Sequence, residues 1–197
     1  MAVVISLLRG VNVVGHNKIK MDALRALYES LGLRGAQTYI QSGNVVFRTR
    51  QTDLARLAKR IENAIEKRFG VRPAVILRTS DELRDVIARN PFTGRSGIEP
   101  NKLLVSFLAA HPSQQARARA LQINSDIEEL HIDGREFFIY FPNGMARPKL
   151  SPAAVEKALQ TPATGRNWNS VTKLSSSPSG EATSSITPSR LRCLRGS

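Results

Sequence analysis

Cysteine and histidine are scarce in this chain, which excludes several kinds of site. There is one cysteine, Cys193, so no disulfide can form within the chain. The three histidines, His16, His111 and His131, do not stand at the spacing of metal ligands. The lack of disulfides fits a reducing compartment. We therefore predict a cytoplasmic protein with no metal and no cofactor.

Long hydrophobic runs are also missing. A helix that spans a bilayer needs about 20 apolar residues, and no stretch approaches that length. The apolar residues 1–8 end at Arg9 and lack a basic leader and a small-residue cleavage site. They indicate a buried strand rather than a signal peptide. We therefore predict no association with a membrane. The sequence does not indicate a protein partner.

Charge is abundant and mostly of one sign. The 197 residues include 29 Lys and Arg against 16 Asp and Glu, which gives a net charge of +13. Such an excess attracts nucleic acid, phosphorylated ligands or acidic membrane surfaces. A solvated basic surface without a specific partner explains the same composition, so the charge alone does not choose among these.

The first 79 residues have the pattern of a ferredoxin-like unit. We predict strands at residues 3–8, 38–40, 45–47 and 73–77, and helices at 21–31 and 54–69. The second helix is the clearest, because Leu57, Ile61 and Ile65 recur at helical spacing and Gly70 ends it. The order β-α-β-β-α-β predicts one antiparallel sheet with two helices on one face.

The following residues repeat a strand, helix, hairpin and helix order. Thr79 and Glu82 form a capping-box pattern that opens a helix, and Asp133-Gly134 is a two-residue hairpin signal. We predict the α+β class, with two ferredoxin-like antiparallel-sheet subdomains at residues 1–79 and 80–174. The Ser-, Pro- and Arg-rich residues 175–197 contain few apolar side chains, and we expect them to be disordered.

The first loop, from Gly10 to Asn17, follows a strand and precedes a helix, as a phosphate-binding loop does. That loop needs Lys directly after its second glycine, but here His16 follows Gly15 and Lys18 comes later. A nucleotide-hydrolysing loop is therefore not predicted. Arg9 and Lys18 still place cations beside a helix N-terminus, which favours an anion. A solvated basic loop is the alternative.

Other candidate residues lie in the hairpin turn at Ser42 and near the C-terminal end. Nothing in the sequence places a base beside Ser42, so a structural turn serine is favoured over a nucleophile. Trp168 is more typical of core packing than of ligand stacking. RNA-recognition domains stack bases on aromatic residues in their two central strands, and here Phe47 alone is aromatic. This RNA-binding mode is not predicted.

Several motifs together resemble an uncharacterised bacterial family, the domain of unknown function 1697. They are Leu7 to Val13 with Lys18, Tyr39 to Phe47, Asn90-Pro91-Phe92, Asn143 to Leu150, and Thr164 to Leu174. The resemblance covers residues 1–174 and implies two ferredoxin-like α+β subdomains in a cytosolic protein. It implies no activity. Val14, His16 and Pro148 depart from the family pattern, and after Leu174 its leucine-rich helix is replaced by serines, as an altered reading frame would produce.

Our leading hypothesis is a protein that binds an anionic, phosphate-bearing ligand, with nucleic acid as one candidate, in a basic cleft between the subdomains. The predicted ligand-binding residues are Arg9, Asn12, Lys18, Ser42, Asn44, Arg147, Lys149, Arg166 and Asn167. No catalytic residue is assigned. One alternative is an enzyme for a small phosphorylated or carboxylated substrate, with Ser42 or His16 near the cations. The other is a structural module that binds a protein partner through an exposed apolar patch.

Overall fold

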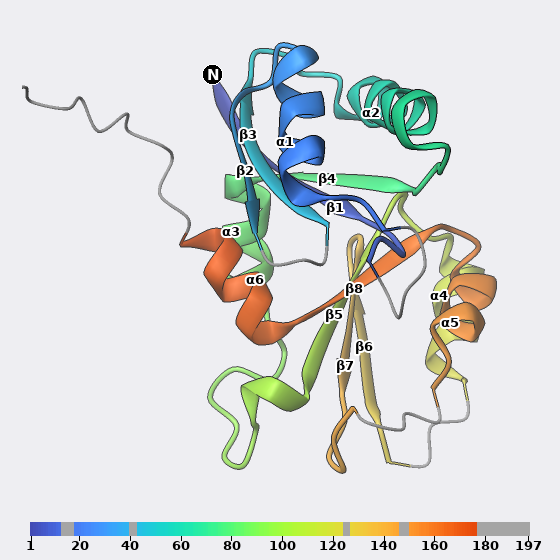
Figure 1. Cartoon of the computed structure of the whole chain (residues 1–197). Helices are drawn as coiled ribbons and strands as arrows, with labels where there is room; N and C mark the ends of the chain where they lie inside the picture. Colours follow the sequence, from blue (N-terminus) through green and yellow to red (C-terminus); the bar gives the residue numbers. More distant parts are fainter. Residues whose placement is uncertain (13–17, 40–42, 124–126, 146–149, 177–197) are drawn as a thin grey trace, which may run out of the picture.

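Two four-stranded antiparallel sheets form the frame of the molecule (Figure 1). The computed structural model describes residues 1–12, 18–39, 43–123, 127–145 and 150–176. Within these residues, no helix is both long and apolar enough to cross a membrane. The predicted α+β class and the pair of ferredoxin-like units are confirmed.

The first sheet has the order β2-β3-β1-β4, formed by β1 (Ala2–Leu8), β2 (Arg34–Tyr39), β3 (Asn44–Thr49) and β4 (Val75–Thr79). Helices α1 (Met21–Ser30) and α2 (Leu54–Phe69) cover its outer face. Leu57, Ile61 and Ile65 of α2 are fully buried against the sheet, which explains why their spacing specified the helix. Gly70 ends α2 with a positive φ of 71°, a conformation that other residues rarely adopt.

The second sheet repeats this arrangement in the order β6-β7-β5-β8. Its strands are β5 (Leu103–Leu108), β6 (Glu129–Asp133), β7 (Glu136–Tyr140) and β8 (Ala163–Asn167), and a short 3-10 turn, η1 (Pro100–Lys102), precedes β5. Helices α4 (Gln114–Leu121) and α5 (Pro152–Leu159) pack on its outer face. We call β1 to β4 with α1 and α2 the first half, and β5 to β8 with α4 and α5 the second half.

The inner faces of the two sheets share one hydrophobic core. Ile5 and Val46 of the first half pack in the same cluster as Val105 and Phe138 of the second. Helices α3 (Ser80–Ala88) and α6 (Trp168–Ser175), each of which follows the fourth strand of its sheet, lie side by side and close one edge of this core (Figure 1). Trp168 packs against this shared core, as the sequence predicted.

Strand β8 was not predicted. Its sequence, Ala-Thr-Gly-Arg-Asn, contains only one apolar side chain of any size and no apolar alternation, and the expected helix was placed from Asn167 onward. The strand forms because β5 offers its open edge, where Val105 pairs with Arg166. With β8, the second half has the same β-α-β-β-α-β order of elements as the first half.

Candidate functional site

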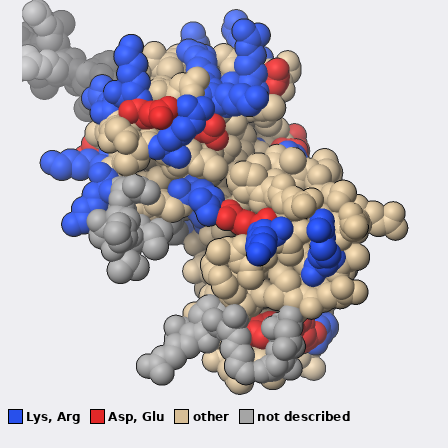
Figure 2. Space-filling view, turned by 90° about the vertical axis from the view of Figure 1, so that its right-hand side faces the viewer, with Lys and Arg blue, Asp and Glu red and all other residues tan. Residues whose placement is uncertain are grey.

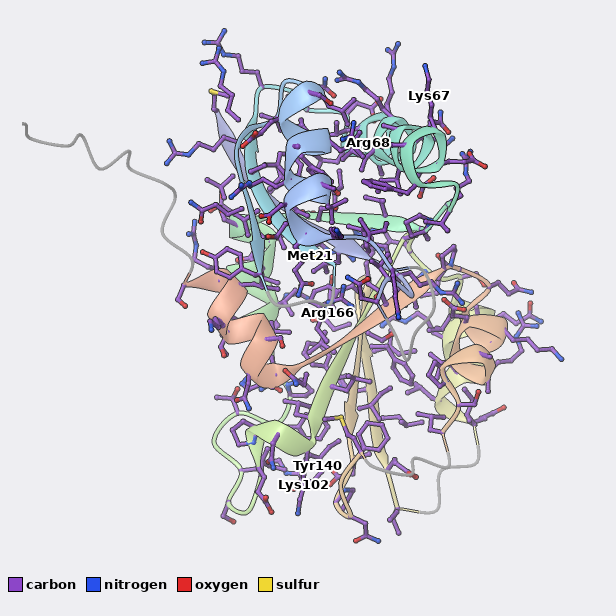
Figure 3. The ribbon with its side chains drawn as sticks, in the orientation of Figure 1. Met21, Lys67, Arg68, Lys102, Tyr140 and Arg166 are labelled. Carbon is purple, nitrogen blue, oxygen red and sulfur yellow. The ribbon has the colours of Figure 1, made fainter. Side chains whose placement is uncertain are left out.

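Two arginines stand at equivalent positions where the halves meet. Arg78 on β4 pairs in register with Ile5 of β1, and Arg166 on β8 pairs with Val105 of β5. Each strand is the fourth of its sheet and lies next to the first. Figure 3 shows Arg166 in the middle of the molecule, between the two sheets. The internal repeat therefore brings both side chains to the contact between the halves.

Each arginine binds the end of a strand in the opposite half. Nη2 of Arg78 donates to the carbonyl oxygen of Leu108, the last residue of β5, at 2.9 Å. Nη2 of Arg166 donates to the carbonyl oxygen of Leu8, the last residue of β1, at 3.0 Å. The two guanidinium groups thus fasten the halves together in a reciprocal way.

The acceptor of the Nε–H group differs between the two sites. Nε of Arg78 donates to Oε1 of Glu136 at 2.9 Å, whereas Nε of Arg166 donates to Oδ1 of Asn44 at 2.6 Å. Glu136 and Asn44 are the first residues of β7 and β3, so they are equivalent in the repeat. A neutral amide therefore occupies the position of a carboxylate, which leaves the Arg166 site more positive by that one charge.

The Arg78 site is closed by further ion pairs. Arg89 contacts Asp133, and its Nη2 lies 3.5 Å from Oε2 of Glu136. Arg135 donates to Glu82 at 2.6 Å. The side chain of Arg78 is 1% exposed, and burial lowers its pKa while Glu136 opposes that shift. This arrangement is complete without any bound molecule.

The Arg166 site opens into a cavity of about 750 Å³. Its polar lining comes from Arg9 and Gly10 after β1, from Ser106 on β5, from Glu156 on α5, from Thr164, Gly165, Arg166 and Asn167 on β8, and from Ser170 on α6. The apolar lining consists of Leu8, Val11, Leu104, Ile139, Phe141, Met145, Leu150, Pro152, Val155 and Ala163. Burial lowers the pKa of Arg166 to about 10, so its guanidinium group stays charged at neutral pH.

An ion pair lies at the outer wall of this cavity. Nη2 of Arg9 is 2.5 Å from Oε2 of Glu156, and their side chains are 50% and 19% exposed. The other carboxylate oxygen of Glu156 accepts a hydrogen bond from the backbone N–H of Ala163 at 2.8 Å. Both residues also line a second, more open hollow of about 510 Å³, together with Arg72. The pair therefore contributes to the walls of both hollows.

The side chains of Asn12 and Asn167 both form hydrogen bonds with the backbone. Asn12 has a positive φ of 57°, which asparagine tolerates, and its side chain accepts from the backbone N–H of Ile19 and donates to the carbonyl of Ile19. It thereby ties together the two ends of the first loop. Asn167 caps α6 by accepting the backbone N–H of Ser170 at 2.8 Å. Asn167 and Ser170 both line the cavity. The N-terminus of α6 therefore adds partial positive charge there.

The structure brings together some of the predicted ligand-binding residues. Arg9, Arg166 and Asn167 line the cavity, and the fully buried Asn44 holds Arg166 in its wall. Lys18 is exposed and does not line the cavity. Ser42, Arg147 and Lys149, as well as His16, lie outside the described residues.

Sequence reasoning missed Glu156 and the equivalence of the two arginines. Glu156 lies on a helix whose start, at Ser151-Pro152, was the only signal in that segment. A signal for the arginines exists, because Arg78 and Arg166 each directly precede the N-cap residue of a helix, Thr79 and Asn167. An alignment of the two halves on these N-cap residues would have shown that Arg78 and Arg166 are equivalent.

The sheet surface that RNA-recognition domains use for base stacking is not accessible. The central strands are β1 and β3, and their inner faces pack against the second sheet. Phe47 points to the other face, is 1% exposed and contacts the ring of Tyr28, with centroids 5.5 Å apart. Neither strand therefore presents an exposed aromatic ring for base stacking, and the absence of this binding mode stays a prediction.

Comparison with known proteins gives a family and a fold. The family model described as "Protein of unknown function (DUF1697)" matches residues 1–138. The structure of conserved bacterial protein SP0830 from Streptococcus pneumoniae aligns with 88% of this chain and 97% of that chain, with a TM-score of 0.62 and 21% sequence identity. No curated protein matches the chain. At this identity the likeness shows a shared fold.

Proposed function

The chain belongs to the family of proteins of unknown function DUF1697, and we propose that it binds a small anionic ligand in the cavity beside Arg9 and Arg166. The observation that carries this proposal is the break in the internal repeat at this place. Asn44 stands where the other half has Glu136, and Arg9 stands where it has Ala109, whose backbone N–H makes the equivalent strand-end bond. Both differences make the surroundings of Arg166 more positive than those of Arg78.

The lining of the cavity suggests the chemistry of the ligand. Arg9 and Arg166 against Glu156 leave one net positive charge, which suits one phosphate or carboxylate group. The N-terminus of α6 favours an anion at the same wall. The remaining wall is mostly apolar, and a volume of about 750 Å³ is typical of small-molecule sites. The ligand would therefore carry one anionic group and an apolar part.

The same lining favours a small molecule over a strand of nucleic acid in this cavity. A polynucleotide carries a phosphate at every residue and needs a series of cations along its path. Here two arginines line the cavity, and one of them, Arg166, is only 7% exposed. The apolar part of the wall has no cation that could bind further phosphates.

The enzyme hypothesis stays a second candidate with less support. Among the described lining residues, the titratable side chains are Arg9, Arg166 and Glu156, and both oxygens of Glu156 are already engaged. A general acid or base needs a free position beside the substrate. Ser42 and His16, the groups on which that hypothesis depends, lie outside the described residues. Binding without catalysis is therefore the simpler proposal.

The partner-binding hypothesis predicts a wide exposed apolar patch. Among the described residues, the exposed large hydrophobic side chains are Met1, Leu121 and Ile127. Single exposed residues of this kind are ordinary on a protein surface. A ligand in the cavity thus has more support than a docked protein, and a cytoplasmic location stays a prediction of the sequence.

The proposal is tested by native mass spectrometry of the freshly purified full chain, which detects a small molecule that co-purifies. Arg9→Gln removes a cation that faces the ligand, so we expect it to reduce the liganded fraction about tenfold. Glu156→Gln removes the carboxylate that competes for Arg9 but keeps an acceptor for Ala163, so we expect it to raise that fraction. Opposite changes in the liganded fraction of the two variants would indicate ligand binding. If the ion pair were only structural, both variants would lose stability and neither would gain ligand.

Arg25→Gln is the matched control, because Arg25 is as exposed as Arg9 and pairs, among the described residues, with Asp22 alone, at 3.6 Å on α1. It should leave the liganded fraction unchanged. Asn44→Asp adds a carboxylate beside Arg166 and should lower the fraction. A chain that carries no ligand and shows no thermal shift with phosphorylated or carboxylated small molecules would contradict the proposal.

A further inference from the structure

The positive charge of the chain is concentrated in the first half. Residues 1–79 contain 14 Lys and Arg against five Asp and Glu, whereas residues 80–174 contain 12 against ten. Among residues 80–174 many cations are neutralised by carboxylates, including Arg84, Arg95 and Arg135. On the face seen in Figure 2, Lys and Arg gather over the upper part, which is the first half, while the lower part carries few.

Four of these cations line one groove of about 730 Å³. They are Arg50, Arg56, Lys59 and Arg60, and they lie on the β3–α2 connection and the first two turns of α2. All are exposed, and among the described residues none of them forms an ion pair. The remaining lining is Gln51, Thr52, Asp53 and Asn63.

The carboxylates near the groove are engaged in other contacts. Asp53 accepts the backbone N–H of Arg56 at 2.9 Å and so caps α2. Glu66 pairs with Arg72 at 2.6 Å, and Glu62 accepts the N–H of Val75 at 2.9 Å. Among the described residues none of these acids forms an ion pair with a groove cation, and four cations against Asp53 leave the groove a net charge of +3.

The cations continue along one side of α2. Arg56, Lys59, Arg60 and Lys67 are separated by three, one and seven positions, which places them on one stripe of the helix. Figure 3 shows Lys67 projecting outward from the same helix. At about 1.5 Å per residue, the stripe is ~16 Å long. It can therefore meet several phosphates of one nucleic-acid backbone.

We propose that this groove binds the phosphate backbone of double-stranded nucleic acid without reading its sequence. Among the described residues no aromatic side chain lines the groove, so unpaired bases have no surface on which to stack. The described lining contains no apolar side chain either, and the apolar face of α2 is buried, which argues against insertion into a membrane. Rows of phosphates are the partner that unneutralised arginines, amides and hydroxyls recognise best.

The test measures fluorescence polarisation of a labelled DNA duplex of arbitrary sequence with the full chain. With about four phosphate contacts, log K should fall against log salt with a slope of roughly −3.6, so affinity drops ~100-fold between about 50 and 200 mM salt. Arg56→Gln with Lys59→Gln and Arg60→Gln should make the slope shallower by about 2.7. Arg84→Gln with Arg119→Gln and Lys157→Gln is the control variant, which removes the same charge from exposed positions outside the first half and should change the slope by less than about 1.

Arg60 also donates to the carbonyl of Leu31 at 2.9 Å, so the double variant Arg56→Gln with Lys59→Gln provides a version that keeps this bond. It should make the slope shallower by about 1.8. Equal losses of affinity in the groove variant and the control variant would overturn the proposal in favour of diffuse charge. Equal affinity for polyglutamate or for anionic vesicles would overturn the choice of nucleic acid. Arg9→Gln should leave the duplex affinity unchanged, which separates this site from the cavity.

Discussion

At the scale of single residues, Arg78 and Arg166 make equivalent contacts in different electrostatic surroundings. Both are almost fully buried and both bind the last carbonyl of a strand in the opposite half. Arg78 faces Glu136, so its charge is balanced, whereas Arg166 faces the neutral Asn44 beside a cavity. The charge of Arg78 is thus balanced within the protein, and the cavity beside Arg166 is the place at which we propose a ligand.

We expect Glu136→Gln to lower the free energy of unfolding by about 3 kcal/mol, because it leaves the buried Arg78 without the carboxylate that balances it. Urea unfolding at neutral pH measures this change. The control is Glu129→Gln, which breaks a pair with Arg95 whose side chains are 43% and 48% exposed. It should cost less than about 1 kcal/mol. Equal losses would show that burial of the Arg78 pair has no special importance.

Tyr28 gives a prediction about alkaline pH. Its hydroxyl lies 2.7 Å from the hydroxyl of Ser6 in the core, and burial raises its pKa above the unfolded value near 10.0. The unfolded chain therefore loses this proton first as the pH rises, so the folded state loses stability above pH 10. Relative to Tyr28→Phe, wild-type stability should fall by about 1.4 kcal/mol per pH unit there. Parallel pH profiles of the two proteins in urea unfolding would contradict this.

At the scale of elements, the ends of the helices are fixed by identifiable caps. Thr79 and Glu82 form a reciprocal capping box at the start of α3: the Thr79 hydroxyl accepts the N–H of Glu82 at 3.1 Å, and Glu82 accepts the N–H of Thr79 at 2.8 Å. Glu82 also binds Arg135 of the second half. The start of α3 therefore contributes both to a helix and to the contact between the halves.

Thr79→Ala should lower the free energy of unfolding by about 1 kcal/mol, because it removes this cap. Ser151 is the matched control: it stands at the N-cap of α5 but its side chain makes no capping hydrogen bond. Ser151→Ala should therefore change stability by less than about 0.5 kcal/mol. Chemical denaturation of both variants checks the difference, and a larger loss in Ser151→Ala would show that the cap geometry does not decide stability here.

At the scale of the whole molecule, the two halves share their central core. Residues of both sheets, with α3 and α6, form one hydrophobic cluster, and Arg78 and Arg166 connect the halves by hydrogen bonds. Separation of the halves would expose the inner faces of both sheets to water. The halves are therefore expected to unfold together.

This expectation is tested with Trp168, the one tryptophan, which packs against the shared core. Its fluorescence reports the contact between the halves, while far-UV circular dichroism reports helices and strands of both. In urea the two signals should show coincident midpoints, as a single cooperative transition requires. A fluorescence transition that clearly precedes the circular dichroism transition would mean that the halves separate before they unfold.

The sequence by itself determined the features that depend on near neighbours: helix α2, the capping box at Thr79, the hairpin at Asp133-Gly134 and the order of elements in the first half. Helical spacing, caps and two-residue turns act within a few residues, so they are visible in the chain. Tertiary structure alone decided β8, because its residues have no strand pattern and pair only where β5 offers an edge. It also decided the site. Arg9 meets Glu156 across 147 positions and Arg166 meets Leu8 across 158, contacts that exist only because the two sheets dock face to face.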